Sequence, residues 1–578
     1  MSEPTIVRRP LGGTSRLPDD YHPVVKRVLA ARGVLELADL DTSLDGLFRA
    51  DSLGGVDAAV TLLERAIVNS KNIVIVADFD ADGATSCAVA IRALTAMGAR
   101  DPRYLVPNRF EYGYGLTPPI VELAKAGLPD LLITVDNGIS SIDGVAAARA
   151  SGIDVIITDH HLPGAILPNA NAIVNPNVPG DAFPSKCLAG VGVIFYVMLA
   201  LRKRLLETNW FKAQNIDYPN LAELLDLVAL GTVADVVPLD QNNRRLVAQG
   251  LARIRFGKAH AGIRALLKIS GKDIKRLNSI DLAFAVAPRL NAAGRLADMS
   301  LGIECLISDN AAVCDRYAIE LDDLNRERRE IESEMKTQAV EFVDAMRLSD
   351  GAALRSGICL IDESWHQGVV GIIASRIKER YHRPVIAFAP VSDTELKGSG
   401  RSIPGVHLRD ALDAIAAANP GLLSKFGGHA MAAGLTLGLS EFELFSEAFD
   451  AEINRQVGQA GLTEEITTDG ALSGVDFDLD LATRLGEIAP WGQLFPEPLF
   501  DGIFRIVEKR IVGESHLRMK LQATDESGVV EAIAFGAVDE PWARDAEVIH
   551  AAYRLSVNEY RGSRTLQLIV TFAQAFEK

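Results

Sequence analysis

Short apolar runs rich in β-branched residues alternate with alanine-rich stretches between residues 72 and 177. The runs are Ile73–Val76, Leu131–Val135, Val155–Ile157 and Ala172–Val174, and the stretches between them include Ala84–Met97 and Ile142–Ala150. Runs of this length are typical of buried strands, and the longer stretches are typical of helices. Strand and helix in alternation predict an α/β fold with a doubly wound parallel sheet.

Strings rich in aspartate and histidine follow three of these runs. They are Asp78-Phe79-Asp80-Ala81-Asp82-Gly83, Asp136-Asn137-Gly138 and Asp159-His160-His161. The carboxyl ends of parallel strands meet at the edge of an open sheet where ligands bind. Carboxylate and imidazole ligands suit manganese or magnesium. Each string alone also fits a turn or a buried histidine, whereas three strings at neighbouring strand ends favour a metal site.

A fourth acidic position lies in an otherwise uncharged run. Asp235 stands within Leu227–Leu239, which contains no other charged residue. Because burial of an unpaired carboxylate costs several kcal/mol, Asp235 should have a cation nearby. A helix cap or a salt bridge is the alternative explanation.

The rest of the chain predicts three further parts. Asp315–Met346 is dense in opposite charges and fits a solvent-exposed helix that connects two lobes. A second α/β unit begins with the strand-like run Gly357–Ile361 and continues through the helical stretch Val369–Tyr381. Strand-like runs from Phe500 onward predict a small antiparallel barrel of the OB type: Ile503–Val507, Leu517–Leu521, Val529–Ala534, Tyr553–Val557 and Leu566–Val570.

Composition limits the compartment and the partners. The net charge of −17 argues against a polyanionic partner, but a bound pair of divalent ions would reverse the local sign at the carboxylates. The five cysteines show no paired spacing, which favours a reducing cytoplasm over a disulfide framework. The longest apolar stretch, Cys187–Leu201, is short for a bilayer span and predicts a buried core helix. We therefore expect a cytoplasmic protein without a membrane partner.

The acidic strings together resemble the four motifs of the DHH phosphoesterase superfamily. The matching residues are Asp80-x-Asp82, Asp136-Asn-Gly, Asp159-His160-His161 and Gly231-Thr-Val-Ala-Asp235. Within the superfamily, the sequence is similar to the RecJ family of bacterial single-strand-specific 5′→3′ DNA exonucleases. Longer strings that agree with this family include Val106–Gly115, Leu188–Gly192, Ala287–Leu296, Trp365–Gly371, Gly398–Ser402 and Gly427–Gly434.

The resemblance implies a two-metal phosphodiesterase. It assigns two manganese ions, with magnesium as the alternative, to Asp80, Asp82, Asp136, His160 and Asp235. In this assignment Asp136 bridges the ions, His161 faces the scissile phosphate, and Asp159 orients an imidazole. Many superfamily members have a histidine where this chain has Val76, so Asp78 is a candidate additional ligand. Two such ions activate water for in-line attack, which would release a 5′-mononucleotide.

Preference for a 5′ end requires an anion site beside the metals. Arginine binds phosphate bidentately, and glycine-rich turns present backbone N–H groups. The resemblance places the candidates around a cleft between two lobes: Arg109, Arg289, Asn291, Arg295, Ser399, Arg401, Gly428 and His429. Pairing with carboxylates is the alternative role for each arginine.

The terminal barrel offers residues for a surface that tracks a single strand. Arg518 and Lys520 alternate along one run and so share a face, and Tyr560, Arg561 and Arg564 lie in a later turn. Aromatic and cationic side chains on an OB face bind single strands. The barrel region is not basic overall, so binding should be modest and salt-sensitive. The resemblance implies single-stranded DNA as substrate, and a single-strand-binding protein and a RecQ-type helicase as partners of a monomer.

We expect five segments along the chain: an N-terminal extension (1–50), a DHH catalytic domain with a parallel sheet (51–310), a long connecting helix (311–346), a DHH-associated α/β domain (347–458) and an all-β OB-fold domain that binds nucleic acid (459–578). The leading hypothesis is a metal-dependent 5′→3′ exonuclease of single-stranded DNA in recombination and repair. A DHH phosphodiesterase of short oligonucleotides is the alternative, which the terminal barrel disfavours. A catalytically silent DNA-binding scaffold is disfavoured because every motif is intact.

Overall fold

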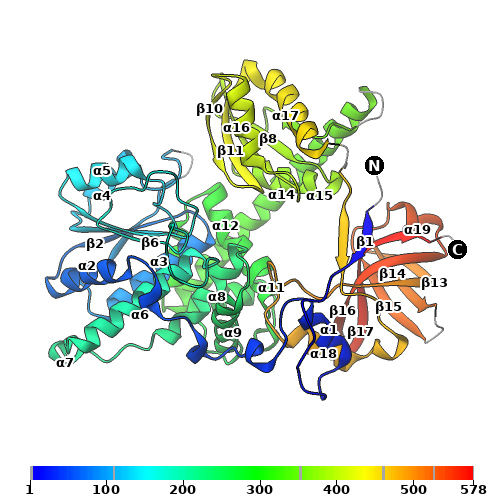
Figure 1. The fold of residues 1–578 in the computed structure, drawn as a ribbon, viewed down its shortest axis with the longest axis horizontal. Helices are drawn as coiled ribbons and strands as arrows, with labels where there is room; N and C mark the ends of the chain where they lie inside the picture. Colours follow the sequence, from blue (N-terminus) through cyan, green and yellow to red (C-terminus); the bar gives the residue numbers. More distant parts are fainter. Residues whose placement is uncertain are drawn as a thin grey trace. The chain divides into compact units, whose positions relative to one another are not determined.

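A computed structural model describes residues 4–108, 111–349, 354–458, 462–524, 528–560 and 562–576. The chain forms two compact units (Figure 1). One consists of Arg8–Asp322 and Thr467–Lys578, and the other of Asp323–Ile466 with the first residues of the chain. Strand β1 (Thr5–Arg8) pairs with β12 (Glu465–Thr468). None of the described helices combines the length and the apolarity that crossing a bilayer requires.

The predicted parallel sheet is present in the first unit. Its strands are β2 (Ile73–Ala77), β3 (Arg103–Leu105), β4 (Leu131–Val135), β5 (Asp154–Thr158) and β6 (Ala172–Val174), in the order β3-β2-β4-β5-β6. All neighbouring pairs are parallel. Ala77, Val135 and Thr158 lie in register. The residues that follow β2, β4 and β5 therefore emerge side by side at one edge of the sheet.

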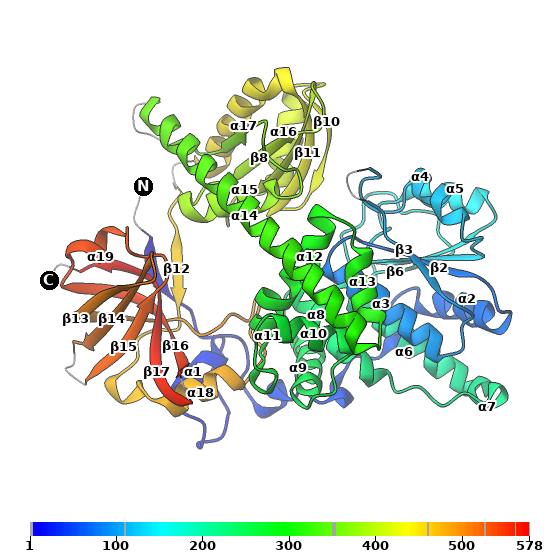
Figure 2. The ribbon, with the colours of Figure 1, turned by 180° about the vertical axis from the view of Figure 1, so that it is seen from behind.

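Helices cover both faces of this sheet (Figure 2). One face carries α4 (Pro118–Lys125) and α5 (Ile142–Ala150), and the other carries α2 (Val56–Val68), α3 (Ala81–Ala96) and α6 (Gly190–Glu207). Burial between two helical layers explains why the inner strands β2, β4 and β5 are almost wholly buried and mainly apolar. Helix α6 contains most of the long apolar stretch, and it is buried throughout its first nine residues, 190–198, as predicted.

A helical region follows the sheet and leads into a long helix. Its elements are η4 (Leu221–Leu224), α8 (Leu225–Ala234), α9 (Gln241–Arg255), α10 (Ala261–Ile269), α11 (Ser279–Asp281), the π-helical turn η6 (Leu282–Val286), α12 (Ala287–Leu296) and α13 (Ser300–Ile307). Helix α14 (Ala311–Ser349) is the predicted connecting helix and contributes residues to both units. Opposite charges pair one turn apart along it, as between Arg316 and Glu320.

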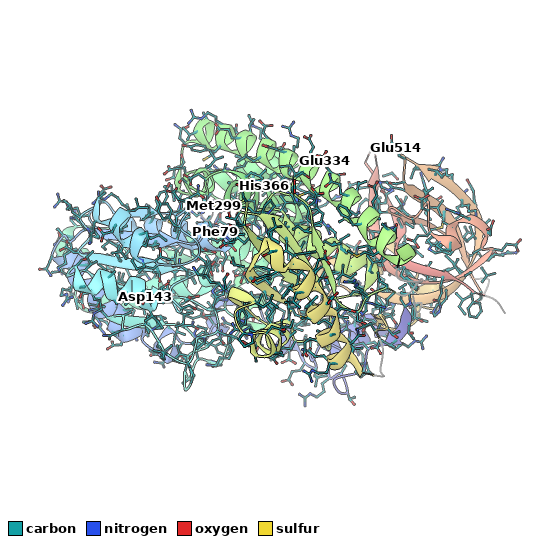
Figure 3. All side chains as sticks on the ribbon, turned by 90° about the horizontal axis from the view of Figure 1, so that it is seen from above. Phe79, Asp143, Met299, Glu334, His366 and Glu514 are labelled. Carbon is teal, nitrogen blue, oxygen red and sulfur yellow. The ribbon has the colours of Figure 1, made fainter. Side chains whose placement is uncertain are left out.

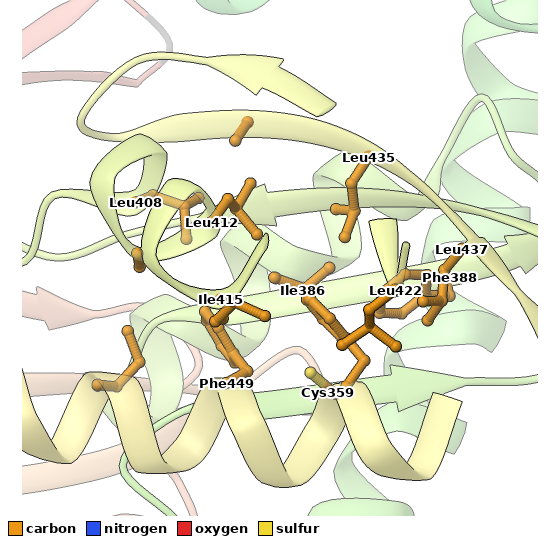
Figure 4. Close-up of a cluster of buried hydrophobic side chains, with 14 of the residues drawn as sticks. Cys359, Ile386, Phe388, Leu408, Leu412, Ile415, Leu422, Leu435, Leu437 and Phe449 are labelled. Carbon is orange, nitrogen blue, oxygen red and sulfur yellow. The ribbon is translucent and has the colours of Figure 1, made fainter. Parts of the chain in front are cut away.

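The second unit is the predicted second α/β fold. Its sheet follows the order β10-β11-β9-β8-β7, formed by β7 (Ile358–Ile361), β8 (Val385–Pro390), β9 (Glu395–Arg401), β10 (Leu423–Gly428) and β11 (Ala432–Gly438). Strands β7 and β8 pair in parallel, and the other neighbours are antiparallel. Helices α16 (Leu408–Ala418) and α17 (Phe442–Val457) help to form the core, where Figure 4 shows Ile386, Leu412 and Phe449 together. Helix α15 (Val370–Tyr381) lies against β8 and β9.

A closed five-stranded barrel confirms the predicted OB-type fold. The strands β13 (Phe500–Val512), β14 (His516–Ala523), β15 (Val529–Ala534), β16 (Val548–Tyr560) and β17 (Ser563–Ala575) close in the order β13-β14-β15-β17-β16. One pairing differs from the antiparallel barrel that the sequence predicts, because β15 and β17 are parallel. Strand β14 is antiparallel to both β13 and β15, and β16 is antiparallel to both β13 and β17. Strands β13, β15 and β17 therefore run in the same direction, so β17 is parallel to β15.

A buried ion pair ties the N-terminal extension to the segment before the barrel. Arg32 follows α1 (Pro23–Ala30) and donates to both carboxylate oxygens of Asp469, at 2.7 and 2.9 Å. Each side chain is 1% exposed. The guanidinium also donates to the carbonyls of Val28 and Pro496, both at 2.8 Å. These bonds make the extension an integral part of the first unit.

Candidate metal centre

The loop between β2 and α3 carries the first acidic string. Asp80 is the N-cap of α3, and its Oδ1 accepts hydrogen bonds from the amides of Asp82 and Gly83 at 2.9 and 3.0 Å. The Asp82 carboxylate accepts from the amides of Gly190 and Val191, at 2.6 and 3.0 Å, where α6 begins. The starts of two helices therefore fix these two carboxylates, because helix N-termini favour negative charge.

Asp136 follows β4 with a left-handed backbone, at a φ of +62°. It is 2% exposed. The next residue, Asn137, donates from Nδ2 to the carbonyls of Val76 and Val135 at 3.1 and 2.9 Å. This bridge joins the ends of β2 and β4. The left-handed backbone of Asp136 is strained for a residue other than glycine. Strain of this kind persists only where the surrounding structure holds it, and it is concentrated at functional sites.

The string after β5 forms a hydrogen-bonded turn around Asp159. Oδ1 of this buried carboxylate accepts from the amides of His160 and His161 at 2.7 and 3.1 Å, and it lies 2.7 Å from Nδ1 of His161. Oδ2 accepts from the amide of Ile139 at 2.9 Å. Asp159 therefore makes the contact expected of a residue that orients an imidazole.

His160 faces carboxylates that come from other elements. Its Nε2 lies 3.1 Å from Oδ1 of Asp136 and 3.4 Å from Oδ2 of Asp235, and Asp235 is the C-cap of α8. The ligand atoms of all the predicted metal residues fall into three groups, and the atoms within each group lie within 4.8 Å of one another: Asp136, His160 and His161; Asp82, His160 and Asp235; and Asp78, Asp80 and Asp136.

This donor set fits divalent metal ions. Oδ1 of Asp136 is buried, and Nε2 of His160 lies 3.1 Å from it without the geometry of a hydrogen bond. A buried acceptor left in this way costs about 1–3 kcal/mol. A cation among the clustered carboxylates would satisfy it, and carboxylate oxygens with an imidazole nitrogen are suitable ligands for such an ion.

Burial and mutual repulsion oppose ionisation of the clustered carboxylates. Burial and the charges of Asp82 and Asp80 raise the pKa values of Asp136 and Asp235 well above the usual carboxyl range. Burial and the charge of Asp80 raise the pKa of Asp82 to about 7. Divalent cations would relieve this repulsion and restore the ionised form.

Asp159 and His161 form a favourable charge pair beside the cluster. Burial disfavours both charged forms, but the hydrogen bond and charge of the partner outweigh it. The pKa of Asp159 is lowered, and the pKa of His161 is raised to about 9. The contact with Asp159 therefore favours the protonated imidazole, next to carboxylates that would bind metal.

Two glycines make room for the cluster, and sequence reasoning assigned no role to either. A Cβ at Gly190 would lie 2.6 Å from Oδ1 of Asp136. A Cβ at Gly231 would lie 2.8 Å from Oδ1 of Asp82 and closer still to Thr85. Helices α6 and α8 can therefore approach the carboxylates this closely because they carry glycine there. Both glycines lie in strings that resemble family motifs, which is their signal in the sequence.

Tyr114 is another residue that the sequence-based assignment missed. Its hydroxyl lies 3.3 Å from Nδ1 of His161 and 3.3 Å from the carbonyl oxygen of Asp136. Burial and the charges of Asp78 and Asp159 raise the pKa of Tyr114 well above its usual value. The phenol is therefore a protonated donor beside the cluster. The only signal for it in the sequence is its place in the family-like string Val106–Gly115.

The first unit contains half of the predicted anion-site residues. Arg289 on α12 is 8% exposed and pairs with Asp322 at 2.7 Å, which is the alternative role considered for it. Oδ1 of Asn291 accepts a hydrogen bond from the amide of Ala81 at 2.8 Å. Arg295 lies on the same helix, and Arg109 lies outside the described residues. Phosphate contacts by this group stay predictions.

The second unit contains the other predicted anion-site residues. Ser399 and Arg401 alternate on β9, and Nη1 of Arg401 donates to Oγ of Ser399 at 3.2 Å. Gly428 ends β10 with a φ of +143°, and the amide of His429 donates to the carbonyl of Ala432 at 2.8 Å. Phosphate binding by this group also stays a prediction.

The barrel cations predicted to bind DNA pair with acidic neighbours. Arg518 and Lys520 on β14 pair with Glu531 and Glu508 on adjacent strands, at 3.0 and 2.6 Å. Arg564 on β17 donates to Oγ1 of Thr483 at 3.1 Å. Arg561 and the side chain of Tyr560 lie outside the described residues. This face of the barrel is a ladder of mixed charge, so any attraction for a polyanion should be modest.

Three family models match the chain in order. The DHH family N-terminal domain matches residues 72–232, the DHHA1 domain residues 353–455, and the RecJ OB domain residues 468–571. The single-stranded-DNA-specific exonuclease RecJ of Salmonella typhimurium is 51% identical over 564 residues, which cover 97% of this chain and 98% of that protein. The chain belongs to the RecJ family. The RecJ of Escherichia coli is 50% identical over the same shares of both proteins.

A solved RecJ structure has the same fold. The crystal structure of RecJ in complex with Mn²⁺ from Thermus thermophilus is 30% identical, with a TM-score of 0.79 over 96% of this chain and 76% of that one. The same RecJ was also solved in complex with Mg²⁺. Both divalent ions therefore occur in a relative of this fold, and the acidic cluster gives this RecJ-family chain a site for divalent metal.

Proposed function

We propose that this RecJ-family chain is a manganese-dependent exonuclease that degrades single-stranded DNA from its 5′ end, in recombination and repair. The observation that carries the proposal is the convergence of carboxylates and imidazoles at the ends of β2, β4, β5 and α8. Similarity to RecJ over nearly the whole chain supports the substrate. The closed barrel supports contact with a strand longer than a dinucleotide.

The chain's own residues would share the work of phosphodiester hydrolysis. Asp80, Asp82, Asp136, His160 and Asp235 would hold two divalent ions, with Asp136 between them. Such a pair lowers the pKa of a water and stabilises charge on the phosphate oxygens. No protein nucleophile is needed, and the product would be a 5′-mononucleotide.

His161 would act on the scissile phosphate itself. Asp159 holds its ring through Nδ1 at 2.7 Å, and the hydrogen bond and charge of Asp159 raise the pKa of the imidazole. A charge-assisted hydrogen bond from this ring would stabilise negative charge that develops on the phosphate oxygens. The same contact would orient the phosphate for in-line attack.

The choice of metal and the polarity are the finer parts of the proposal. We propose manganese because His160 offers a nitrogen ligand, and imidazole suits transition metals better than magnesium, which prefers oxygen. The 5′ polarity would come from an anion site that includes Ser399, Arg401 and His429. We further propose that the chain acts as a monomer with a single-strand-binding protein and a RecQ-type helicase. Sedimentation of the chain alone and with each protein tests this last point.

Digestion of a 5′-phosphorylated, 3′-labelled single strand tests the function. The strand and its duplex form are incubated with Mn²⁺, Mg²⁺ or EDTA. Stepwise shortening of the single strand from its 5′ end in Mn²⁺, abolished by EDTA and by Asp136→Ala, is expected. Asp143→Ala is the matched control, because Asp143 is an exposed aspartate on α5 (Figure 3).

Two results would contradict the proposal. Hydrolysis of dinucleotides or trinucleotides while the long strand survives would identify a phosphodiesterase of short oligonucleotides. Binding of the strand without cleavage under any metal condition would identify a DNA-binding scaffold.

A further inference from the structure

A helix outside the acidic motifs contacts the loop that presents two of the proposed metal ligands. Asn291 and Gly294 lie almost one turn apart on α12, and therefore on one face of it. Oδ1 of Asn291 accepts a hydrogen bond from the amide of Ala81 at 2.8 Å. A Cβ at Gly294 would lie only 1.8 Å from the carbonyl oxygen of Phe79. Helix α12 thus contacts the main chain on both sides of Asp80.

The contact from Asn291 completes the hydrogen bonding of the first turn of α3. The first amides of a helix have no partner within the helix itself. Oδ1 of Asp80 accepts hydrogen bonds from the amides of Asp82 and Gly83. Oδ1 of Asn291 accepts one from the amide of Ala81. Because Oδ1 of Asp80 is occupied in this way, metal binding falls mainly to Oδ2. The direction of that oxygen depends on the backbone that Asn291 holds.

The contact at Gly294 fixes the main chain directly before Asp80, at the carbonyl of Phe79. Any side chain there would meet the Phe79 carbonyl, which is main chain and cannot rotate away without moving Asp80. The Met299 methyl group lies 3.1 Å from the same Cβ position, and Figure 3 shows Phe79 and Met299 close together. The Phe79 carbonyl and the Met299 side chain therefore leave no room for a side chain at residue 294. The π-helical turn η6 directly precedes α12, and such turns are frequent at functional sites.

We propose that Asn291 and Gly294 are positioning residues of the metal centre. They fix the backbone of residues 79–81 and, through it, the carboxylates of Asp80 and Asp82. This inference rests on the proposed function, because it takes these aspartates as metal ligands. In this proposal Asn291 supports the loop of a metal ligand, whereas the sequence predicts that it contacts phosphate.

Metal binding to the full chain without DNA tests this inference. Free Mn²⁺ is followed by electron paramagnetic resonance during titration of wild type, Asn291→Ala, Asn291→Asp and Gly294→Ala. Asn291→Ala should weaken Mn²⁺ binding about 10–100-fold, the usual effect of losing a residue that supports a metal ligand. Asn291→Asp keeps an acceptor oxygen and should restore most of the affinity. At saturating Mn²⁺, the KM for single-stranded DNA should not change in any of the variants.

Two control variants separate positioning from general damage. Asn310→Ala removes the same kind of bond, because the amides of Ala312 and Val313 at the start of α14 donate to Oδ1 of Asn310. Gly486→Ala adds a methyl group in α18 (Leu479–Glu487), where nothing lies within 4 Å. Both should bind Mn²⁺ as the wild type does. Gly294→Ala should weaken Mn²⁺ binding in the same range as Asn291→Ala, because the added methyl group displaces the Phe79 carbonyl. If either variant fails to fold by circular dichroism, the other carries the test.

Three results would overturn the inference. They are unchanged Mn²⁺ affinity in a folded Asn291→Ala protein, equal weakness in Asn291→Asp, and a raised KM for DNA with unchanged Mn²⁺ affinity. The last would instead support a phosphate contact. Failure of the proposed function is distinguishable, because wild type would then bind Mn²⁺ in this titration without degrading the strand.

Discussion

Removal of the Arg32 guanidinium should weaken the packing of the N-terminal extension against the segment before the barrel. Arg32→Ala deletes both bonds to Asp469 and the bonds to the carbonyls of Val28 and Pro496. It leaves a carboxylate that is 1% exposed. Loss of one partner of a buried ion pair costs about 3–5 kcal/mol, because the other charge stays uncompensated. Arg9, with Nε 3.6 Å from Asp469, should hold the loss near the lower end, about 3 kcal/mol.

Hydrogen exchange on the full chain measures this loss as a local free energy of opening. The amide of residue 469 is the best reporter, because it donates to the carbonyl of Leu499 at 2.5 Å and this main-chain bond is kept in every variant. Arg16→Ala is the control: its pair with Glu36 is exposed, at 68% and 47%, and should be worth at most about 1 kcal/mol. The double variant Arg32→Met with Asp469→Leu should recover part of the stability, since it leaves no unpaired buried carboxylate, while the Leu499 amide and Arg9 lose their contacts with Asp469. Equal effects of Arg32→Ala and Arg16→Ala, or a double variant as weak as Arg32→Ala, would refute this reasoning.

Two further predictions concern single carboxylates. Asp159→Asn should lower nuclease activity about 10–100-fold, because the charge that orients and protonates His161 is lost; a folded variant with wild-type kcat would contradict this. Asp501→Asn should destabilise the chain at neutral pH. Burial opposes ionisation of Asp501, but hydrogen bonds from Arg8 and Thr468 lower its pKa below the usual value. Its stabilisation is therefore present above the unfolded-state pKa and is lost as the pH falls through the lower folded-state pKa. The difference in melting temperature between wild type and Asp501→Asn should shrink below about pH 4, and a constant difference would count against it.

Most of the acidic cluster could be predicted from the sequence because most of its residues follow strands; Asp235, the C-cap of α8, was predicted instead from its lone charge in an apolar run. A parallel register brings the residues after Ala77, Val135 and Thr158 to one edge, so local patterns were enough to gather the aspartates and histidines there. The OB-type barrel was predictable for the same reason, since alternating strands and turns are local signals.

Contacts between distant segments could not be predicted in this way. The bond from Ala81 to Asn291 joins residues 210 positions apart, and no periodicity records it. The same holds for the pairing of Arg289 with Asp322, which uses a buried guanidinium for structure. The parallel pairing of β15 with β17 was missed because it depends on how the barrel closes, and strand-like runs carry no direction.

Closure of the barrel through the β15–β17 pair also limits how it can recognise anything. An open sheet edge presents free backbone donors and acceptors, to which an extended partner can add as a further strand. Where described strands of the barrel pair on both sides, as at Ala532–Ala534 of β15, these groups are used internally, so those stretches offer no main-chain template. Whatever those stretches bind must then be read by side chains, and affinity and selectivity there can change by substitution while the backbone stays the same.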